Sequence, residues 1–331
     1  MSAAAAGTVP DLSIVIVSYR VRDVLRGCLR SLFVDGGVRG LGDVEVVVVD
    51  NASGDGTVQM MRAEFPGVRL FALNENRGFS AGNNVGLAAA TGRHVLLLNP
   101  DTVVPDGALA ACVTYLDAQP ENVGAMTCRV ESEDGSLQWE CSRRLITPWS
   151  ECCRALLLDR ALKRIDMFNR EPVVGWDRAD AREVECLLGA FMLIRRRALE
   201  AVGDLDERFF LMYEDVDWCR RLRDVGFRAV FWPGARITHL GGQSWRQDPI
   251  ATYANTHASA VLYFEKHHPR AVGAVRLVSR LGMEMKILLL RLNLLRRPGD
   301  AYTVKHLEMA RAARRSLQTG EFLRGAAAPT P

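Results

Sequence analysis

Leu12-Ser-Ile-Val-Ile-Val-Ser18 and Val44-Glu-Val-Val-Val-Val49 are the stretches that decide the fold of this chain. Both are short runs rich in β-branched residues, a pattern typical of strands that are covered on both faces. An amphipathic helical pattern lies between them, and further strands are expected at Val68 to Leu73 and at His94 to Leu98. Strands and helices that alternate at this spacing predict an α/β fold, with a mostly parallel central sheet and helices on both faces.

The composition is that of an ordinary globular protein. Of 331 residues, 48% are apolar and 24% are charged, which excludes intrinsic disorder as a description of the whole chain. Forty-two basic and 39 acidic residues give a formal charge of +3, so a dedicated nucleic-acid binder is not expected. The eight cysteines form no C-x-x-C pair, which indicates reduced thiols in a cytosolic protein.

The carboxyl ends of the predicted strands carry polar residues. Open parallel sheets bind ligands at these ends, and here they read Ser18-Tyr19, Asp50-Asn51-Ala-Ser53 and Asn99-Pro-Asp101. Neither the dinucleotide fingerprint G-x-G-x-x-G nor a P-loop lysine motif follows the first strand. A nucleotide that binds at this edge must therefore be held by other means.

Asp101 and His239 are candidate metal ligands. Pro100 cannot continue a central strand, so Asp101 is left at the sheet edge, where its carboxylate can hold a divalent ion that also binds a diphosphate. The alternative is a turn or cap, because Asp101 precedes a predicted helix. His239 follows another apolar run, and it is either a half-buried structural histidine or a second ligand for a manganese-like ion.

Two loops have the chemistry of a nucleotide site. Asp50 can accept a hydrogen bond from a base imide, although turn chemistry explains the loop from Asp50 to Thr57 equally well. The segment from Asn74 to Gly86 combines Arg77, glycines such as Gly78 and several amides. Such a set suits an anionic, hydroxyl-bearing ligand, and its glycines would weaken a helix that served only as scaffold.

An acidic pair directly follows an apolar-aromatic stretch. Glu214 and Asp215 open a predicted helix, where the helix dipole favours an ionised carboxylate that suits a general base. Asp217 lies on the same helix and can pair with an arginine three or four residues later. We interpret Asp217 as structural and Glu214 with Asp215 as the chemical pair.

In their order and spacing, these segments resemble the family 2 inverting glycosyltransferases, whose fold is called GT-A. The resemblance runs from Leu12 to about Ser244. It implies that Asp215 is the catalytic base with Glu214 beside it, and that Asp101 and His239 bind the metal. It implies a nucleotide-sugar site made of Ser18, Tyr19, Asp50, Asn51, Ser53, Arg77, Gly78, Asn84, Asn99 and Asp101.

The resemblance is strongest to bacterial rhamnosyltransferases that act on polyprenyl-linked sugars. It implies Mg²⁺ or Mn²⁺ as cofactor, dTDP-rhamnose as the favoured donor, and a glycan or lipid-linked acceptor in cell-envelope polysaccharide synthesis. The alternatives are transfer from a UDP- or GDP-sugar and a non-catalytic nucleotide-sugar binding protein. The second alternative would not need both Asp215 and His239.

The chain is expected to have four parts. Residues 1–10 and 319–331 are predicted to be disordered or flexible tails, residues 11–250 form the catalytic domain, and residues 251–318 are helical. Within the catalytic domain, residues 11–105 bind the nucleotide and residues 106–250 lie on the acceptor side.

The helical part contains a candidate membrane-surface helix at 270–297. On a helical wheel its basic residues share one side and its leucines the other, which suits an anionic membrane. The alternative is packing on the catalytic domain or in a homodimer. The predicted location is the cytoplasm, at the inner face of the cell membrane.

Overall fold

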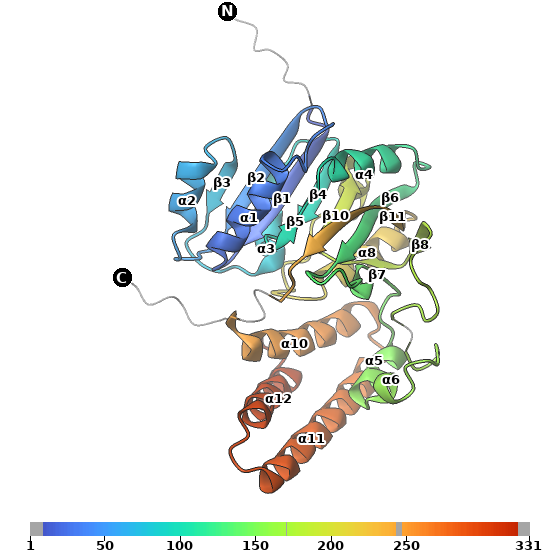
Figure 1. Ribbon diagram of the computed structural model, residues 1–331. Helices are drawn as coiled ribbons and strands as arrows, with labels where there is room; N and C mark the ends of the chain where they lie inside the picture. Colours follow the sequence, from blue (N-terminus) through green and yellow to red (C-terminus); the bar gives the residue numbers. More distant parts are fainter. Residues whose placement is uncertain (1–8, 170, 243–246, 324–331) are drawn as a thin grey trace, which may run out of the picture.

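The computed structural model describes residues 9–169, 171–242 and 247–323. Most of the tail expected at 1–10 lies outside the described residues, and the tail expected at 319–331 is described only to residue 323. Figure 1 shows a sheet domain with a separate group of helices beside it.

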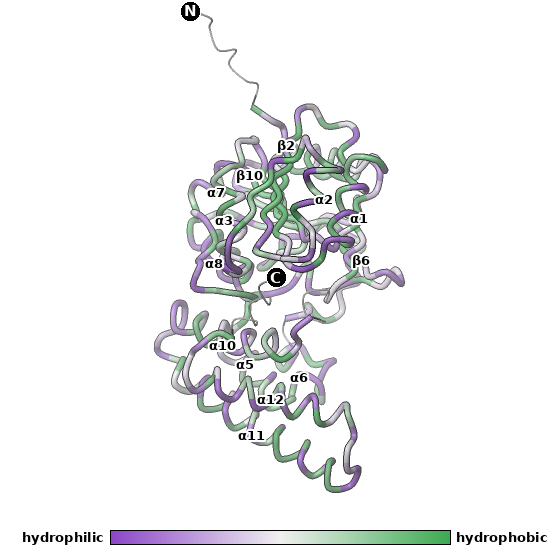
Figure 2. Tube along the Cα trace, turned by 90° about the vertical axis from the view of Figure 1, so that its left-hand side faces the viewer, coloured by the Kyte–Doolittle hydropathy of each residue, from purple (hydrophilic) through white to green (hydrophobic). Residues whose placement is uncertain are grey.

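The first half of the sheet domain is parallel, as the sequence predicts. β1 (Leu12–Ser18), β2 (Val44–Asp50), β3 (Arg69–Ala72) and β4 (His94–Leu98) lie in the order β3-β2-β1-β4. All seven residues of β1 are buried. This burial follows from the helices on both faces, α1 and α2 on one side and α3, α7 and α8 on the other (Figure 2).

The helices of this domain begin and end as follows: α1 (Arg22–Phe33), α2 (Thr57–Glu64), α3 (Phe79–Ala89), α4 (Ala108–Asp117), α7 (Arg196–Val202) and α8 (Glu214–Asp224). Helix α3 lies close against β1, because a Cβ added at Gly86 would lie 2.4 Å from Val15 Cγ1. The other glycine one turn earlier, Gly82, packs in the same way on Val17.

The second half of the sheet is mixed. β10 (Phe191–Arg195) runs antiparallel between β4 and β6 (Val123–Glu131), and β11 (Arg228–His239) is parallel to β6. The short β5 (Thr102–Val103) and β8 (Arg182–Val184) pair with β11. Asp101 therefore lies in a turn and caps no helix, because Thr102 pairs with His239 as a strand residue and α4 begins only at Ala108.

The segment between β6 and β10 contains little regular structure. A two-stranded sheet joins β7 (Ser142–Arg143) to β9 (Cys186–Leu187), and a 3-10 turn precedes it at Trp139–Cys141. The two short helices of this segment are α5 (Pro148–Ala155) and α6 (Leu158–Ala161).

The C-terminal part is helical, as predicted. α10 (Pro249–His267), α11 (Val272–Arg296) and α12 (Ala301–Thr319) pack on one another around a small cluster that includes Val261, Met283 and Leu307. Within the described part of the chain, no helix is both long and apolar enough to cross a bilayer.

The helical group adjoins the carboxyl ends of the parallel strands (Figure 1). Ser259 Oγ of α10 donates to Leu211 O at 2.8 Å, just before α8. Gln247 Nε2 donates to Arg20 O, just after β1, at 2.6 Å. Both contacts place α10 beside the edge of the sheet at which the sequence predicts the ligand.

Candidate functional site

The ends of β1 and β2 form one polar corner. Asn51 N donates to Ser18 O at 2.8 Å, and Ser53 N donates to Asp50 Oδ2 at 3.3 Å. Ser53 Oγ accepts a hydrogen bond from Arg20 N at 3.0 Å. Four residues that the sequence assigns to the nucleotide site therefore lie together.

This corner contains buried oxygen atoms that the described residues do not satisfy. Ser18 Oγ and Asp50 Oδ1 are buried and have no hydrogen-bond partner among the described residues. Burial also raises the pKa of Asp50. Because buried polar atoms in folded proteins are normally bonded, these two atoms mark a position where a ligand can donate hydrogen bonds.

The backbone around the corner is strained. Arg20 has φ 55° and Ala52 has φ 60°, in the left-handed region that costs about 1–3 kcal/mol for such residues. Tyr19, between Ser18 and Arg20 in the sequence, is half-buried. The Arg20 guanidinium lies 5.0 Å from the centroid of its ring. Strain of this kind is concentrated at ligand sites, where the surrounding bonds hold it in place.

Asn51 shapes the next loop. Its side chain donates to Asn76 Oδ1 and to Gly78 O, both at 2.9 Å, and accepts from Arg77 N at 2.9 Å. Because both the nitrogen and the oxygen of its amide bond to residues 76–78, Asn51 stabilises the conformation of this loop. The half-exposed Arg77 side chain is paired with Glu207 at 3.5 Å.

Glycine is required at position 78. Gly78 has φ 88°, and an added Cβ would lie 2.5 Å from Phe210 O. Asn84 is also used inside the protein, since its amide donates to Leu205 O at 2.9 Å and accepts from Leu205 N at 3.0 Å. With Gly82 and Gly86 packed on β1, helix packing accounts for the glycines that the sequence suggested were needed for a ligand.

The ends of β4 and β11 bring the predicted metal ligands together. His239 Nε2 lies 3.2 Å from Asp101 Oδ1 and 3.3 Å from Asn99 Nδ2. All three residues are buried or nearly so, and Asn99 Oδ1 has no partner within the described part. The antiparallel pairing of Thr102 with His239 brings Asp101 and His239 together, although they are 138 positions apart in the sequence.

Gln138 fixes the orientation of His239. Its Oε1 lies 2.7 Å from His239 Nδ1, and its Nε2 donates to His239 O at 2.8 Å. An amide oxygen accepts from Nδ1–H, which leaves Nε2 as a lone-pair donor toward Asp101. No local pattern in the sequence marks Gln138 as part of the site.

These residues fit a divalent cation. A carboxylate, an oriented imidazole and an unpartnered amide oxygen are suitable donors for a manganese- or magnesium-like ion. No three acidic, histidine or cysteine side chains of residues 9–169, 171–242 and 247–323 form a complete metal cage. A cation held here would therefore share its coordination with oxygens of a ligand such as a diphosphate.

The acidic pair lies next to this cluster. Asn99 N donates to Ala190 O at 3.0 Å, and the neighbouring Gly189 N donates to Asp215 Oδ2 at 3.3 Å. The same carboxylate oxygen accepts from Arg143 Nη2 at 3.5 Å. The loop between β9 and β10 therefore connects the candidate metal ligands with the candidate base.

Burial dominates the electrostatics of Glu214. Burial raises the pKa of Glu214 to about 8, and the neighbouring charge of Asp215 acts in the same direction. The expectation that Glu214 stays ionised is wrong, because burial outweighs the helix N-terminus. The residue before it, Tyr213, has φ 70°, so the backbone is strained here too.

Asp217 is structural, as predicted. The residue is fully buried and pairs with Arg221 at 2.9 Å, Lys266 at 2.7 Å and His267 at 2.7 Å. Although burial opposes it, the bonds from His267 and Lys266 lower the pKa of Asp217. The residue anchors α8 to α10.

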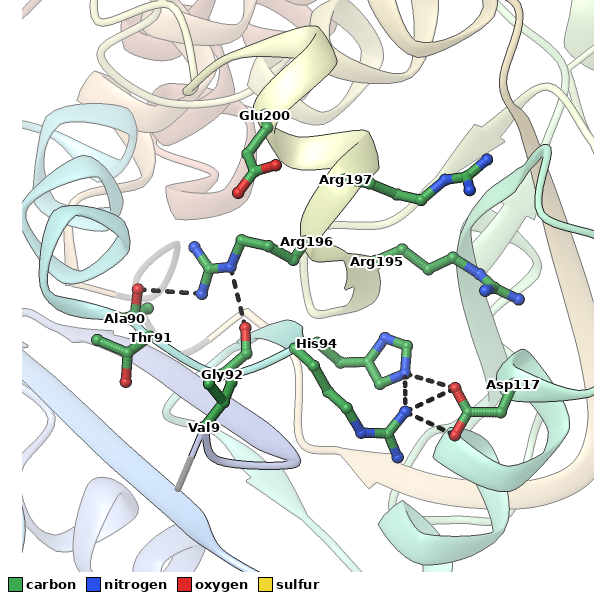
Figure 3. A pocket seen from close by; sticks show the side chains of 11 residues that line it. Val9, Ala90, Thr91, Gly92, His94, Asp117, Arg195, Arg196, Arg197 and Glu200 are labelled. Atoms are coloured by element: carbon green, nitrogen blue, oxygen red, sulfur yellow. Dashed lines mark hydrogen bonds and ion pairs between the residues drawn. The ribbon is translucent and has the colours of Figure 1, made fainter. Parts of the chain in front are cut away.

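A hollow of about 710 Å³ lies at the opposite end of the sheet, by the amino end of β4 (Figure 3). Its arginines bond to the protein itself: Arg93 to Asp117 at 2.8 Å and Arg196 to Gly92 O at 2.9 Å. Among the described residues, His94 Nδ1 and Arg195 Nε of this hollow lack partners, as do Ser18 Oγ, Asp50 Oδ1 and Asn99 Oδ1 at the opposite edge. We place the site at the carboxyl ends of the strands, because open parallel sheets bind ligands there.

Comparison with known proteins identifies the family of this chain. Residues 10–251 match the family described as glycosyltransferase like family 2. The chain is 27% identical over 253 residues to an N-acetylglucosaminyl-diphospho-decaprenol L-rhamnosyltransferase of Mycobacterium tuberculosis, covering 68% of this chain and 76% of that one. It is 25% identical over 171 residues to the rhamnosyltransferase WbbL of Escherichia coli, covering 49% and 60%.

The fold is GT-A, as the resemblance implied. A mannosyltransferase from Pyrobaculum calidifontis, solved in complex with GDP-Man and Mn²⁺, superposes with a TM-score of 0.50. That alignment covers 94% of this chain and 88% of the mannosyltransferase, at 18% sequence identity.

Proposed function

We propose, from the premise that this chain belongs to glycosyltransferase like family 2, that it is an inverting, metal-dependent rhamnosyltransferase. The favoured donor is dTDP-rhamnose, and the acceptor is a hydroxyl of a glycan or of a polyprenyl-linked sugar. The observation that carries the proposal is the gathering of Asp50, Asp101, His239 and Asp215 along one edge of the sheet.

The donor nucleotide is assigned to the corner between β1 and β2. The unsatisfied Asp50 Oδ1 accepts the imide N–H of a pyrimidine base, and Ser18 Oγ bonds a neighbouring polar atom of the nucleoside. Thymine and uracil both carry this imide, so Asp50 selects the class of base. Discrimination between dTDP- and UDP-sugars is left to the sugar part of the donor.

Asp101 and His239, with Asn99 beside them, are the residues that would hold Mg²⁺ or Mn²⁺. Such an ion supplies electrostatic stabilisation to a diphosphate leaving group. Gln138 keeps the His239 ring in the orientation that leaves Nε2 free to bind.

Asp215 takes the part of the general base. It accepts the proton of the acceptor hydroxyl while the hydroxyl oxygen attacks the anomeric carbon from the face opposite the nucleoside diphosphate. One displacement forms the glycosidic bond, breaks the bond to the diphosphate oxygen and inverts the anomeric centre. Gly189 N and Arg143 position the carboxylate, whereas the protonated Glu214 does not compete for the proton.

The rhamnosyl and lipid-linked parts of the proposal are supported by the two bacterial rhamnosyltransferases to which the chain is similar. One of them is named for a diphospho-decaprenol acceptor, a molecule that resides in a membrane. An acceptor of this class places the reaction at the cytoplasmic face of the cell membrane, in cell-envelope polysaccharide synthesis.

A donor panel tests the proposed function. Release of nucleoside diphosphate is measured with dTDP-rhamnose, UDP-sugars and GDP-sugars, each with Mn²⁺, Mg²⁺ or a chelator. We expect turnover with dTDP-rhamnose and either metal, and none with the chelator. Faster turnover of a UDP- or GDP-sugar would overturn the assigned donor, and full turnover with the chelator would overturn the metal assignment.

A further inference from the structure

Helix α11 has an exposed apolar stripe that the glycosyl-transfer site does not use. Its seven members are between 37% and 79% exposed. They are Leu277, Leu281, Met285, Leu288, Leu289, Leu292 and Leu295. Residues three, four or seven apart lie on one side of a helix, so these side chains form a continuous strip on the 25-residue helix.

The opposite side of α11 holds the helix on the protein. Val275, Met283 and Ile287 are buried, the last two in the cluster shared with α12. An added Cβ at Gly282 would lie 2.2 Å from Ala155 O of α5. The helix therefore packs on the catalytic domain through this side, as one alternative expected, whereas the leucine stripe faces outward.

The helical wheel places the basic residues of α11 on one face, but in the structure they do not all lie there. Lys286 points inward and donates to Tyr253 Oη at 2.8 Å, and Arg276 pairs with Glu265. Arg280, Arg291 and Arg296 are exposed and border the stripe. Glu284, the acid beside the stripe, is already paired with Arg314 at 3.4 Å.

This pattern favours a bilayer over a second copy of the chain. The leucines match the acyl region of a membrane surface. The bordering arginines, which form no ion pair with the described acidic residues, match its anionic headgroups. Two copies that met through the same strip would instead bring their own arginines together in an apolar contact, where unpaired charges are costly.

The position of α11 agrees with a membrane-held acceptor. In Figures 1 and 2, α11 is the helix farthest from the sheet, and α10 lies between the two. The carboxyl ends of the parallel strands point toward this helical group. A surface that contacts α11 therefore lies on the same side of the sheet as Asp215.

We propose that the leucine stripe of α11 and its bordering arginines dock this protein, in the plane of the surface, on an anionic lipid bilayer. At 1.5 Å per residue the helix is about 38 Å long, so the stripe can lie along the headgroup boundary without crossing the membrane. The docking rests on the exposed residues of α11, and only its link to the acceptor rests on the proposed function.

Flotation of the full chain with vesicles tests the docking. Vesicles of phosphatidylcholine are compared with vesicles in which about one third of the lipid is phosphatidylglycerol. Neither carries an acceptor, so the result is independent of catalysis. We expect the protein to float with the anionic vesicles and to be released as salt screens the arginines.

Two sets of variants separate the apolar and the charged contributions. The triple variant L281Q/L288Q/L292Q should lose at least about tenfold in partitioning. Its control, V34Q/M167Q/V225Q, changes three hydrophobic residues that are equally exposed elsewhere and should float as the parent does. R280Q/R291Q should lose about 30-fold on anionic vesicles, at about 1 kcal/mol per arginine, and its control R30Q/R62Q should not.

Donor turnover and sedimentation velocity complete the test. Each variant should keep the parent's release of nucleoside diphosphate, which shows that it is folded and separates this proposal from the proposed function. Absence of flotation by the parent, or equal flotation by L281Q/L288Q/L292Q and its control, would overturn the docking. A dimer that the leucine substitutions dissociate, without any vesicle binding, would assign the stripe to a second copy.

Discussion

Replacement of Glu214 by glutamine tests the electrostatics of the acidic pair. Burial and the charge of Asp215 raise the pKa of Glu214 from 4.5 to about 8. Because one pKa unit corresponds to about 1.36 kcal/mol, ionising Glu214 in the folded chain costs about 5 kcal/mol more than in the unfolded chain. Glutamine has nearly the same shape and no charge to bury.

The sign of the pH dependence follows from which state holds the proton. Between pH 4.5 and about 8, the folded chain keeps the Glu214 proton that the unfolded chain releases. This group therefore lowers the free energy of unfolding as the pH rises, by about 1.4 kcal/mol per unit. Its contribution is fully present below pH 4.5 and is lost by the time the pH passes about 8.

Urea unfolding, followed by tryptophan fluorescence at several pH values from 5 to 8, measures the effect. We expect E214Q to gain stability over the parent steadily across this range, by about 3–4 kcal/mol in total. The exposed Glu133 offers a control, and E133Q should follow the parent. If the free energies of unfolding of E214Q and the parent changed with pH in parallel, the assignment of a proton to Glu214 in the folded chain would be refuted. E214Q should also keep its transfer rate, since the parent is already protonated at this position.

Four further predictions test the site and the scaffold. D215N should bind donor normally and lose about 10²–10⁴-fold in transfer rate, measured with saturating dTDP-rhamnose; near-parental turnover would exclude this base. D101A should abolish the gain in dTDP affinity that Mn²⁺ brings in calorimetry, whereas a purely structural aspartate would lower only the melting temperature. Q138L should weaken Mn²⁺ binding by about 10–100-fold with an unchanged metal-free melting curve, and unchanged Mn²⁺ affinity would remove its positioning role. G86A should destabilise the chain by about 1–3 kcal/mol because of the close contact with β1, whereas G27A, which meets nothing within 4 Å, should not.

The parallel half of the sheet could be predicted from the sequence because its signal is local. β1 and β2 are short apolar runs whose residues are buried almost throughout, and no distant partner is needed to recognise them. The same reasoning placed Ser18, Asp50 and Asp101 at one edge, since the carboxyl ends of parallel strands lie together.

The segments after β4 were harder to predict because their pairing is not local. Thr102 is a strand residue only because β11 returns to lie beside it, and from its neighbours alone it looked like the start of a helix. Gly82 and Gly86 looked like ligand-binding glycines, and only the contact with β1 showed that close packing requires them.

The sequence by itself determined the fold class, and it indicated Asp50, Asp101, Asp215 and His239 as candidate site residues. Tertiary structure alone decided that Gln138 orients His239 and that Arg143 and Gly189 hold Asp215. It also decided the charge of Glu214 and the direction in which the leucines of α11 face. The physical reason is that strand patterns depend on neighbours along the chain, whereas burial, protonation and side-chain contacts depend on residues brought together from distant parts of it.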